Sequence, residues 1–319
     1  MSSNGTAPRL VSSAELVERG VTRRRLESLI RTGELVRVRR GLYVAGADVP
    51  TGVFATEDRI ALRARAAASG HRDGTVISHV SALAVHGLPV HDLDARRVTT
   101  TRQRPGSGTR ASDFAICHSA DLDGAVTEVD GMPVTSVART VVDVARQRRF
   151  AGALCAADAA MKTGKCTLAD LRAELDAAAG RSGIAHARSV IGFADGRAES
   201  VLESISRLAI HRLRLPAPEL QVELRLSSGR VVRVDMFWEE YNLVGECDGV
   251  TKYGAERGVE HVRAVLDEEK VRQIEIEADG FRVSRWLMKH ATDSARLGRI
   301  LTTVMEQQQA QEFRRPLRS

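Results

Sequence analysis

The feature that most constrains the fold of this chain is the segment 231–253, in which isolated carboxylates interrupt two apolar runs. The segment reads VVRVDMFWEEYNLVGECDGVTKY, and it places Asp235 in the first strand-like run and Glu246 and Asp248 at the end of the second. A carboxylate that is buried without a positive partner is costly. Three carboxylates on neighbouring strands therefore indicate a bound divalent metal.

The surrounding residues predict a mixed domain over 196–319. A helix is expected over 198–213, with Glu199 and Glu203 one turn apart on one face. The pattern then predicts strands over 220–226, 231–238 and 243–248, a helix over 262–278 and a last strand over 281–286. The predicted order of elements is α-β-β-β-α-β.

This order, with acids at these points, resembles the restriction-endonuclease-like PD-(D/E)XK fold. Its closest variety is the family related to very-short-patch repair endonucleases, here called Vsr-like. The segments that carry the resemblance are AESVLES, VRVDMFW, VGECDG, EEKVRQ and GFRVSRW. The resemblance implies a C-terminal domain that hydrolyses phosphodiester bonds in nucleic acid.

A magnesium ion (or Mn²⁺) would supply the chemistry of such a site, because it activates water and neutralises charge on the scissile phosphate. Magnesium prefers oxygen ligands and uses few protein carboxylates. The resemblance implies that Asp235 and Glu246 bind the metal directly. It also implies a further ligand from the carbonyl of Cys247, and a contribution from Glu203 on the helix.

One position departs from the PD-(D/E)XK pattern. The family has a lysine two residues after the motif glutamate, and this chain has Asp248 there. We expect Lys252 or Lys270 to supply the cation instead. The predicted catalytic residues are therefore Asp235, Glu246, Asp248, Lys252 and Lys270. The alternative is an inactive domain whose acids only protect an exposed strand edge.

The first 48 residues predict a basic module that binds DNA. Helices are expected over 14–19 and 23–32, ended by Gly20 and Gly33, and a basic hairpin is expected over 34–45. This is the plan of a winged helix-turn-helix. Residues 1–47 hold nine arginines and four glutamates, and the difference supplies five of the six positive charges in the formal net charge of +6.

The second helix of that plan enters the major groove, and the hairpin is the wing. The arginines expected to contact DNA lie at the start of the second helix and on the wing: Arg23, Arg24, Arg25, Arg37, Arg39 and Arg40. The alternative is a small helical module that packs on a partner protein and uses its arginines only for solubility.

The first half of the chain resembles the AbiEi antitoxins of type IV toxin–antitoxin systems. The resemblance begins in the N-terminal module and continues through TVISHVSALAVHGLP (75–89) and TSVARTVVDVAR (135–146). It implies a transcriptional regulator that has a toxin as its partner.

The middle domain, 49–195, reads as mixed and mostly helical. Short strands are expected near 75–77, 97–100 and 114–118. We expect His79, His86 and His118 to be structural, because no carboxylate or cysteine lies at ligand spacing beside them. Arg139 and Asp143 are four residues apart and predict an ordinary helical ion pair. No chemistry is assigned to this domain.

The four cysteines are scattered without a CxxC pair, so neither a zinc site nor a disulfide framework is expected. No apolar run approaches the length that crosses a bilayer, and no secretory signal opens the chain. We therefore expect a cytoplasmic protein without a membrane partner.

The predicted fold class is α/β, or α+β over the whole chain, in three domains: 1–48, 49–195 and 196–319. The predicted function is a DNA-binding protein with a metal-dependent endonuclease domain, acting in phage defence or in a toxin–antitoxin pair. The main alternative is a non-enzymatic AbiEi-type repressor or antitoxin with an inactive nuclease fold. A nuclease that acts on RNA is a third interpretation, and a homodimer is left open.

Overall fold

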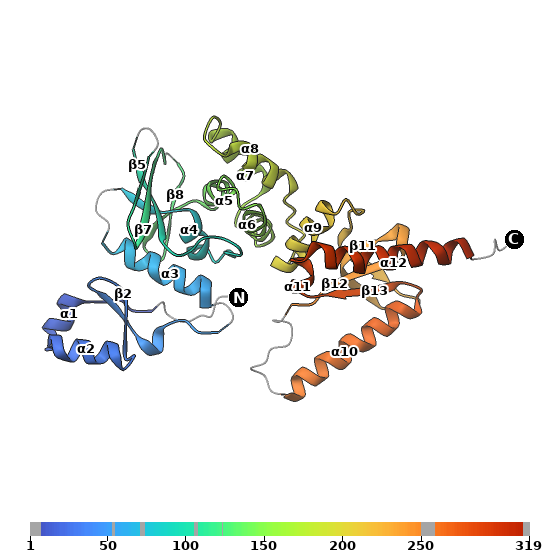
Figure 1. Cartoon of the computed structure of the whole chain (residues 1–319), viewed down its shortest axis with the longest axis horizontal. Coiled ribbons are helices and arrows are strands. Elements are labelled where there is room, and N and C mark those ends of the chain that lie inside the picture. The colour runs from blue at the N-terminus through green and yellow to red at the C-terminus, as the bar shows by residue number, and fades with distance from the viewer. Residues whose placement is uncertain are drawn as a thin grey trace. The chain divides into compact units, whose positions relative to one another are not determined.

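The computed structural model describes residues 8–52, 55–70, 74–104, 108–122, 124–249 and 259–314, with the backbone alone at 259–262, 265–266 and 311–314. The residues form two compact units, Met1–Ala194 and Asp195–Ser319 (Figure 1). The first unit contains the segment 1–48 and the segment 49–195 up to Ala194. The division into three domains therefore stays a prediction.

The first unit begins with a winged-helix-like module. Its elements are β1 (Val11–Ser12), α1 (Ser13–Glu18), α2 (Arg23–Arg31), β2 (Leu35–Arg39), β3 (Leu42–Ala45) and the short 3-10 helix η1 (Gly46–Asp48). The strands form an antiparallel sheet in the order β1-β3-β2. Ser12 caps α1 in a capping box with Glu15, and Thr22 caps α2. The predicted order of helix, helix and hairpin is confirmed.

A six-stranded sheet forms the centre of the first unit, in the order β6-β7-β5-β4-β9-β8. Its strands are β4 (Thr75–Ile77), β5 (Val98–Gln103), β6 (Gly108–Ala111), β7 (Ala115–Ala120), β8 (Val126–Val129) and β9 (Met132–Thr135). The sequence predicted only short strands near β4, β5 and β7. It missed β6 because every residue of that strand is exposed, so no apolar alternation marks it.

Some helices of this unit pack on the sheet, and the others pack on one another beside it (Figure 1). They are α3 (Ala55–Ala68), α4 (His79–Val85), α5 (Val137–Ala145), α6 (Phe150–Lys162), α7 (Leu168–Ala177) and α8 (Ile184–Phe193). Gly152 in α6 lets that helix approach the loop after α4, because an added Cβ would lie 2.3 Å from the carbonyl oxygen of His91. The predicted mixed, mostly helical character of this segment is confirmed.

The second unit is built on a four-stranded sheet in the order β10-β11-β12-β13. Its elements are α9 (Val201–Arg212), β10 (Glu219–Arg225), β11 (Val231–Trp238), η2 (Glu239–Tyr241), β12 (Leu243–Cys247), α10 (Val259–Ala278), β13 (Arg282–Trp286), α11 (Met288–Ala291) and α12 (Ser294–Arg314). The strands β10, β11 and β12 are antiparallel, and β13 runs parallel to β12. From α9 to β13 the elements follow the expected order α-β-β-β-α-β.

The core of the second unit is packed around two tryptophans. Trp286 is 1% exposed, and its indole Nε1 donates to Ser206 Oγ at 2.7 Å. Gly245 lies directly against both rings, because an added Cβ there would come within 2.5 Å of Trp286 and 2.9 Å of Trp238. Trp238 lies opposite Leu243 and Trp286 lies opposite Cys247, so the two rings pack along β12, the strand that carries Glu246. No helix in the described part of the chain is long and apolar enough to cross a membrane.

Candidate functional site

The predicted metal-binding acids lie on neighbouring elements of the second unit. Asp235 is on β11, and its Oδ2 accepts from the backbone N–H of Cys247 at the end of β12, at 2.7 Å. Glu246 is on β12 and buried, and Glu203 is buried in the first turn of α9. Glu199 lies before the N-cap Ser200 and not on the helix as predicted. Four of the expected residues are therefore grouped at one end of the sheet.

Glu203 is held by protein donors. Its two carboxylate oxygens accept from the backbone N–H of Glu199, the hydroxyl of Ser200 and the amide of Gln221. Burial, helped by the negative charge of Asp235, raises the pKa of Glu203. Burial also raises the pKa of the Cys247 thiol well above its usual value, so the sulfur stays protonated at neutral pH.

Two arginines, which the sequence analysis did not single out, neutralise the remaining acids. Arg272 on α10 donates to Glu246 Oε1 at 2.8 Å and lies 3.5 Å from Glu269. Arg285 on β13 binds both oxygens of Asp248, at 2.8 and 3.0 Å, and also donates to Glu269 at 3.0 Å. The bond to Asp248 raises the pKa of Arg285 above its usual value. The only signal for Arg285 was its place between the buried Ser284 and Trp286 on a strand.

As placed, these residues do not fit Mg²⁺ or Mn²⁺. Both oxygens of Asp248 and of Glu203 accept N–H or O–H donors, and a guanidinium 2.8 Å from Glu246 would repel a divalent cation. Within the described ranges, no group of three His, Cys, Asp or Glu is arranged for a metal. Lys270 is exposed on α10, and Lys252 lies outside the described residues. Metal binding therefore stays a prediction.

The arginines predicted to contact DNA are exposed at the start of α2. Arg23, Arg24 and Arg25 are the first three residues of the helix, and the first turn holds no acid. Arg23 pairs with Glu27 at 3.1 Å, and Arg25 lies 4.0 Å from Glu34. A helix N-terminus carries a partial positive charge and favours anions, so three cations there do not stabilise the helix. Their predicted role as DNA contacts stays a prediction.

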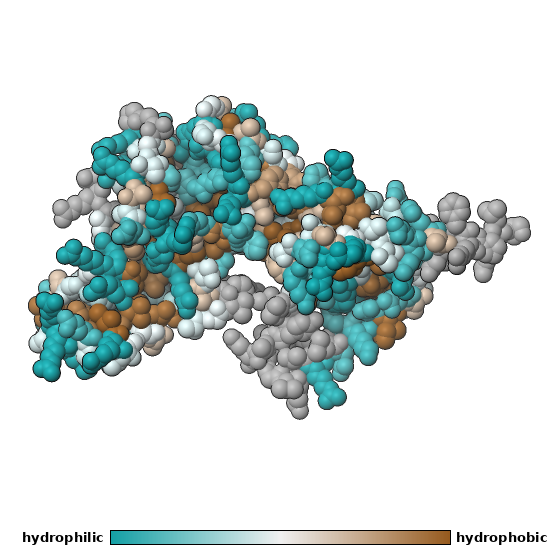
Figure 2. Space-filling view, in the orientation of Figure 1, coloured by the Kyte–Doolittle hydropathy of each residue, from teal (hydrophilic) through white to brown (hydrophobic). Residues whose placement is uncertain are grey.

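The arginines of the wing divide into two kinds. Arg37 and Arg40 are exposed, and the Arg37 guanidinium lies 5.9 Å from the centre of the Tyr43 ring. Arg39 is half-buried, its guanidinium lies against Gly70 at the end of α3, and its Nε is buried without a hydrogen-bond partner among the described residues. Figure 2 shows hydrophilic side chains projecting from the end of the unit that carries α1 and α2.

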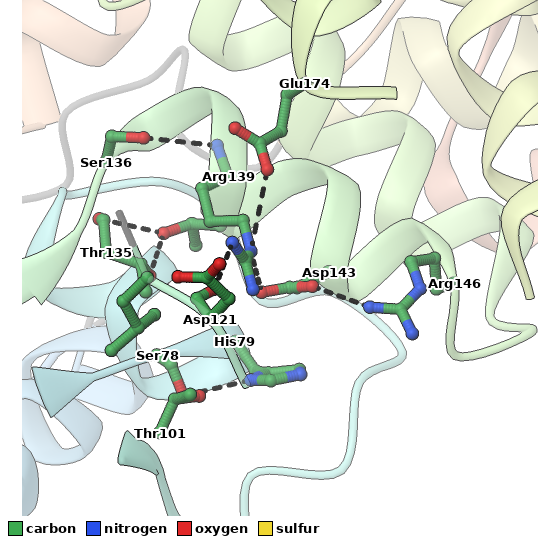
Figure 3. Close-up of polar contacts among 12 residues, drawn as sticks. Ser78, His79, Thr101, Asp121, Thr135, Ser136, Arg139, Asp143, Arg146 and Glu174 are labelled. Atoms are coloured by element: carbon green, nitrogen blue, oxygen red, sulfur yellow. Dashed lines mark hydrogen bonds and ion pairs between the residues drawn. The ribbon is translucent and has the colours of Figure 1, made fainter. Parts of the chain in front are cut away.

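A buried polar cluster lies in the middle region (Figure 3). Arg139 donates to Asp143 at 2.7 Å, which confirms the predicted ion pair, and the two side chains are 4% and 2% exposed. Arg139 also contacts Glu174 and the carbonyl oxygen of Asp121, and Arg146 binds the second oxygen of Asp143 at 2.9 Å. Burial pushes the pKa of Asp143 up, but the nearby positive groups outweigh it and the pKa is lowered.

The three histidines have protein partners, as predicted. His79 Nδ1 lies 2.9 Å from Ser78 Oγ, and its ring is 4.3 Å from that of His118. His86 Nε2 lies 2.8 Å from the carbonyl oxygen of Thr135. Burial lowers the pKa of His79 to about 4, so its imidazole is neutral at physiological pH. A structural role accounts for these contacts.

Two comparisons with protein families cover this first unit. Residues 7–46 match a family described as "Transcriptional regulator, AbiEi antitoxin", and residues 76–193 match the "AbiEi antitoxin C-terminal domain". The chain belongs to the AbiEi antitoxin family. All six predicted DNA-contacting arginines lie within the first AbiEi match, and the buried polar cluster lies within the second.

The AbiEi chain is also similar to two proteins of Mycobacterium tuberculosis. They are "Uncharacterized protein MT2308" of strain CDC 1551 / Oshkosh and "Uncharacterized protein Rv2248" of strain ATCC 25618 / H37Rv. Each is 32% identical over 230 residues, which is 72% of this chain and 79% of the relative. Both AbiEi matches end before residue 194, so they give no support to the Vsr-like interpretation of 196–319.

Proposed function

We propose that this AbiEi-family chain is a non-enzymatic, DNA-binding transcriptional regulator that serves as the antitoxin of a toxin–antitoxin pair. The observation that carries the proposal is the exposed triplet Arg23, Arg24 and Arg25 at the start of α2, within the segment that matches an AbiEi transcriptional regulator. Its partners are DNA and a protein toxin.

The geometry of the winged-helix-like module supports this function. In this plan the second helix lies in the major groove, and its first residues reach base edges and phosphates. Arginine binds both, because its planar guanidinium donates two parallel hydrogen bonds to a phosphate or to guanine. Arg37 and Arg40 on the wing would contact the backbone beside the groove. Arg39, whose guanidinium lies against Gly70, would contribute less.

The second candidate is a metal-dependent endonuclease that uses Asp235 and Glu246. The order of elements from α9 to β13 and the placement of these acids on adjacent strands favour it. The contacts of Arg272 and Arg285 oppose it, because Arg272 neutralises Glu246, an expected metal ligand, and Arg285 neutralises Asp248, an expected catalytic residue. We therefore place the regulator first.

DNA binding is tested with the full chain and a duplex taken from the promoter of its own gene. The variant Arg23→Ala/Arg24→Ala/Arg25→Ala is compared with the wild type by fluorescence anisotropy over a range of salt concentrations. Each lost phosphate contact should reduce the slope of log affinity against log salt by about one. We therefore expect weaker binding and a shallower slope.

A matched control removes the same charge elsewhere in the chain. Arg172, Arg188 and Arg212 are exposed on α7, α8 and α9, and replacing all three by alanine should leave DNA binding close to wild type. Equal losses in the two triple variants would mean that only net charge matters and would overturn the proposed contact surface.

Catalysis is tested separately. The wild type, Asp235→Asn and Glu246→Ala are incubated with DNA or RNA and with Mg²⁺ or Mn²⁺. The regulator proposal expects no cleavage. Cleavage of DNA that both variants abolish would establish the second candidate, and cleavage of RNA alone would establish a ribonuclease.

A further inference from the structure

The strands β5, β6 and β7 carry an arginine-lined hollow that is separate from the winged-helix module. It has a volume of about 90 Å³ and is lined by Arg102, Arg104, Arg110, Cys117 and Ser119. Register explains why these residues meet. Arg102 pairs with Ser119 between β5 and β7, and Arg110 pairs with Cys117 between β6 and β7, so their side chains share one face of the sheet.

The charged side chains that line this hollow are all positive. Three guanidinium groups line it without a carboxylate, and none of the three forms an ion pair with another residue that the structure describes. Among the described residues, the one hydrogen bond that these groups donate runs from Arg102 Nε to Thr75 Oγ1 at 3.5 Å, which is the limit of a useful contact. Arginine stays protonated at all relevant pH values, so an anion is the partner that would balance this charge.

Donor geometry narrows the class of anion. Guanidinium groups bind phosphate with paired hydrogen bonds, and a serine hydroxyl adds a donor that a purely electrostatic patch would lack. Gly108 lies opposite Ser119 in the register, and an added Cβ there would be 3.9 Å from Ser119 Oγ. The absence of a side chain at Gly108 leaves the space above the hydroxyl open.

We propose that this hollow binds one phosphate group, through Arg102, Arg104, Arg110 and Ser119. The ligand is either the backbone phosphate of a nucleic acid or a free phosphate. The site goes beyond the proposed function, which depends on α2 and the wing. A nucleic-acid phosphate would give the AbiEi chain a second DNA contact on the central sheet, while a free phosphate would make the site a separate sensor.

The test uses the full chain and the variant Arg104→Ala/Arg110→Ala, in which both residues are exposed and the half-buried Arg102 is kept. Thermal unfolding is followed with inorganic phosphate and with chloride at equal ionic strength. We expect phosphate to raise the midpoint of the wild type, because a ligand that binds only the folded state stabilises it. The double variant should lose this rise, and Arg172→Ala/Arg188→Ala should keep it.

A measurement of DNA affinity distinguishes a nucleic-acid phosphate from a free phosphate as the ligand. The double substitution is added to Arg23→Ala/Arg24→Ala/Arg25→Ala, and the remaining affinity for a duplex is measured at low salt. A further loss of several-fold, absent when Arg172 and Arg188 are replaced instead, would assign the site to the nucleic-acid backbone. A phosphate-dependent midpoint without that further loss would assign it to a free phosphate.

The proposal is overturned if phosphate does not raise the midpoint of the wild type and the combined variant shows no further loss of DNA affinity. It is also overturned if Arg104→Ala/Arg110→Ala and the control pair behave alike in both measurements. A failure of the proposed function is distinct from either result, since it would appear as unchanged DNA binding when Arg23, Arg24 and Arg25 alone are replaced.

Discussion

Arg272 donates to the carboxylate of Glu246 at 2.8 Å, and only 2% of the Glu246 side chain is exposed. The pair joins α10 to β12, and Glu269 and Arg285 extend it to β13. An ion pair of this kind supplies from within the protein the positive charge that the sequence pattern led us to expect from a metal. The ion pair explains how the charged Glu246 carboxylate is stabilised although it is buried in the sheet.

Arg272→Ala should destabilise the second unit, because it removes the guanidinium that donates to the buried Glu246 carboxylate. Removing one partner of a buried ion pair costs about 3–5 kcal/mol, and we expect the lower end of that range because Arg272 is 16% exposed. Urea unfolding measures the loss. Lys270→Ala, an exposed neighbour on α10, is the control, and an equal loss in both variants would show that the pair is not structural.

Divalent metal should have little effect on the wild type. The carboxylates of Glu246 and Asp248 already accept hydrogen bonds from Arg272 and Arg285. The midpoint of thermal unfolding should therefore be the same in millimolar Mg²⁺ as in EDTA. Differential scanning fluorimetry measures the midpoint, and Ca²⁺ controls for ionic effects. A rise that is specific for Mg²⁺ or Mn²⁺ and that Asp235→Asn removes would show a metal site.

Asp143→Ala should destabilise the first unit strongly. Asp143 receives hydrogen bonds from both Arg139 and Arg146 and is 2% exposed, so its removal leaves one deeply buried guanidinium without its main counter-charge. The expected cost is about 3–5 kcal/mol. The exposed pair of Arg149 and Asp92 provides the control, and Asp92→Asn, which tolerates the positive φ of 50° there, should cost much less because solvent screens that pair. Similar losses would contradict a special role for the buried cluster.

Stability should fall as pH decreases from about 6.5 towards 4. The pKa of His79 is about 4 in the folded protein and 6.5 in the unfolded chain, so the unfolded state binds more protons between these values. Each pH unit in this window costs about 1.4 kcal/mol for each such group. Burial also lowers the pKa of His86 and of His118, which act in the same direction.

The contribution of His79 is isolated by His79→Asn. Asparagine tolerates the positive φ of 51° at this position and can hydrogen-bond to Ser78, so the fold should be kept while the titration is lost. Unfolding midpoints measured from pH 7 to pH 4 should show a shallower decline. His211→Asn, at an exposed histidine, should decline like the wild type. Identical slopes for His79→Asn and the wild type would refute the assignment.

Gly245→Ala should destabilise the second unit. The added methyl would come within 2.5 Å of the Trp286 ring in a packed core, and overpacking typically costs about 1–3 kcal/mol. Gly192→Ala is the opposite case, since nothing lies within 4 Å of an added Cβ in helix α8 and alanine favours a helix. Chemical denaturation of both variants should show changes of opposite sign, and a stable Gly245→Ala would mean that the tryptophans move aside.

The helices could be predicted because their signals are local. Ser12 and Thr22 cap α1 and α2, and Gly20 and Gly33, both with φ of +77°, lie where each helix ends. The strands of the second unit could be predicted because apolar and charged residues alternate along β11. The edge strand β6 could not, because its fully exposed residues show no such pattern.

The sequence by itself determined the basic winged-helix module, the order of elements in the second unit and the grouping of Asp235, Glu246 and Glu203. The module and the order of elements follow from periodicity, caps and charge along the chain, and the grouping of Glu203 with the two strand acids was implied by the resemblance to the PD-(D/E)XK fold. Only the tertiary structure decided what neutralises those acids. Arg272 lies 26 positions from Glu246 along the chain and Arg285 lies 37 from Asp248, so their meeting depends on how α10 and β13 pack on β12. A buried carboxylate demands a positive partner, but the chain alone does not say whether that partner is a metal or a guanidinium.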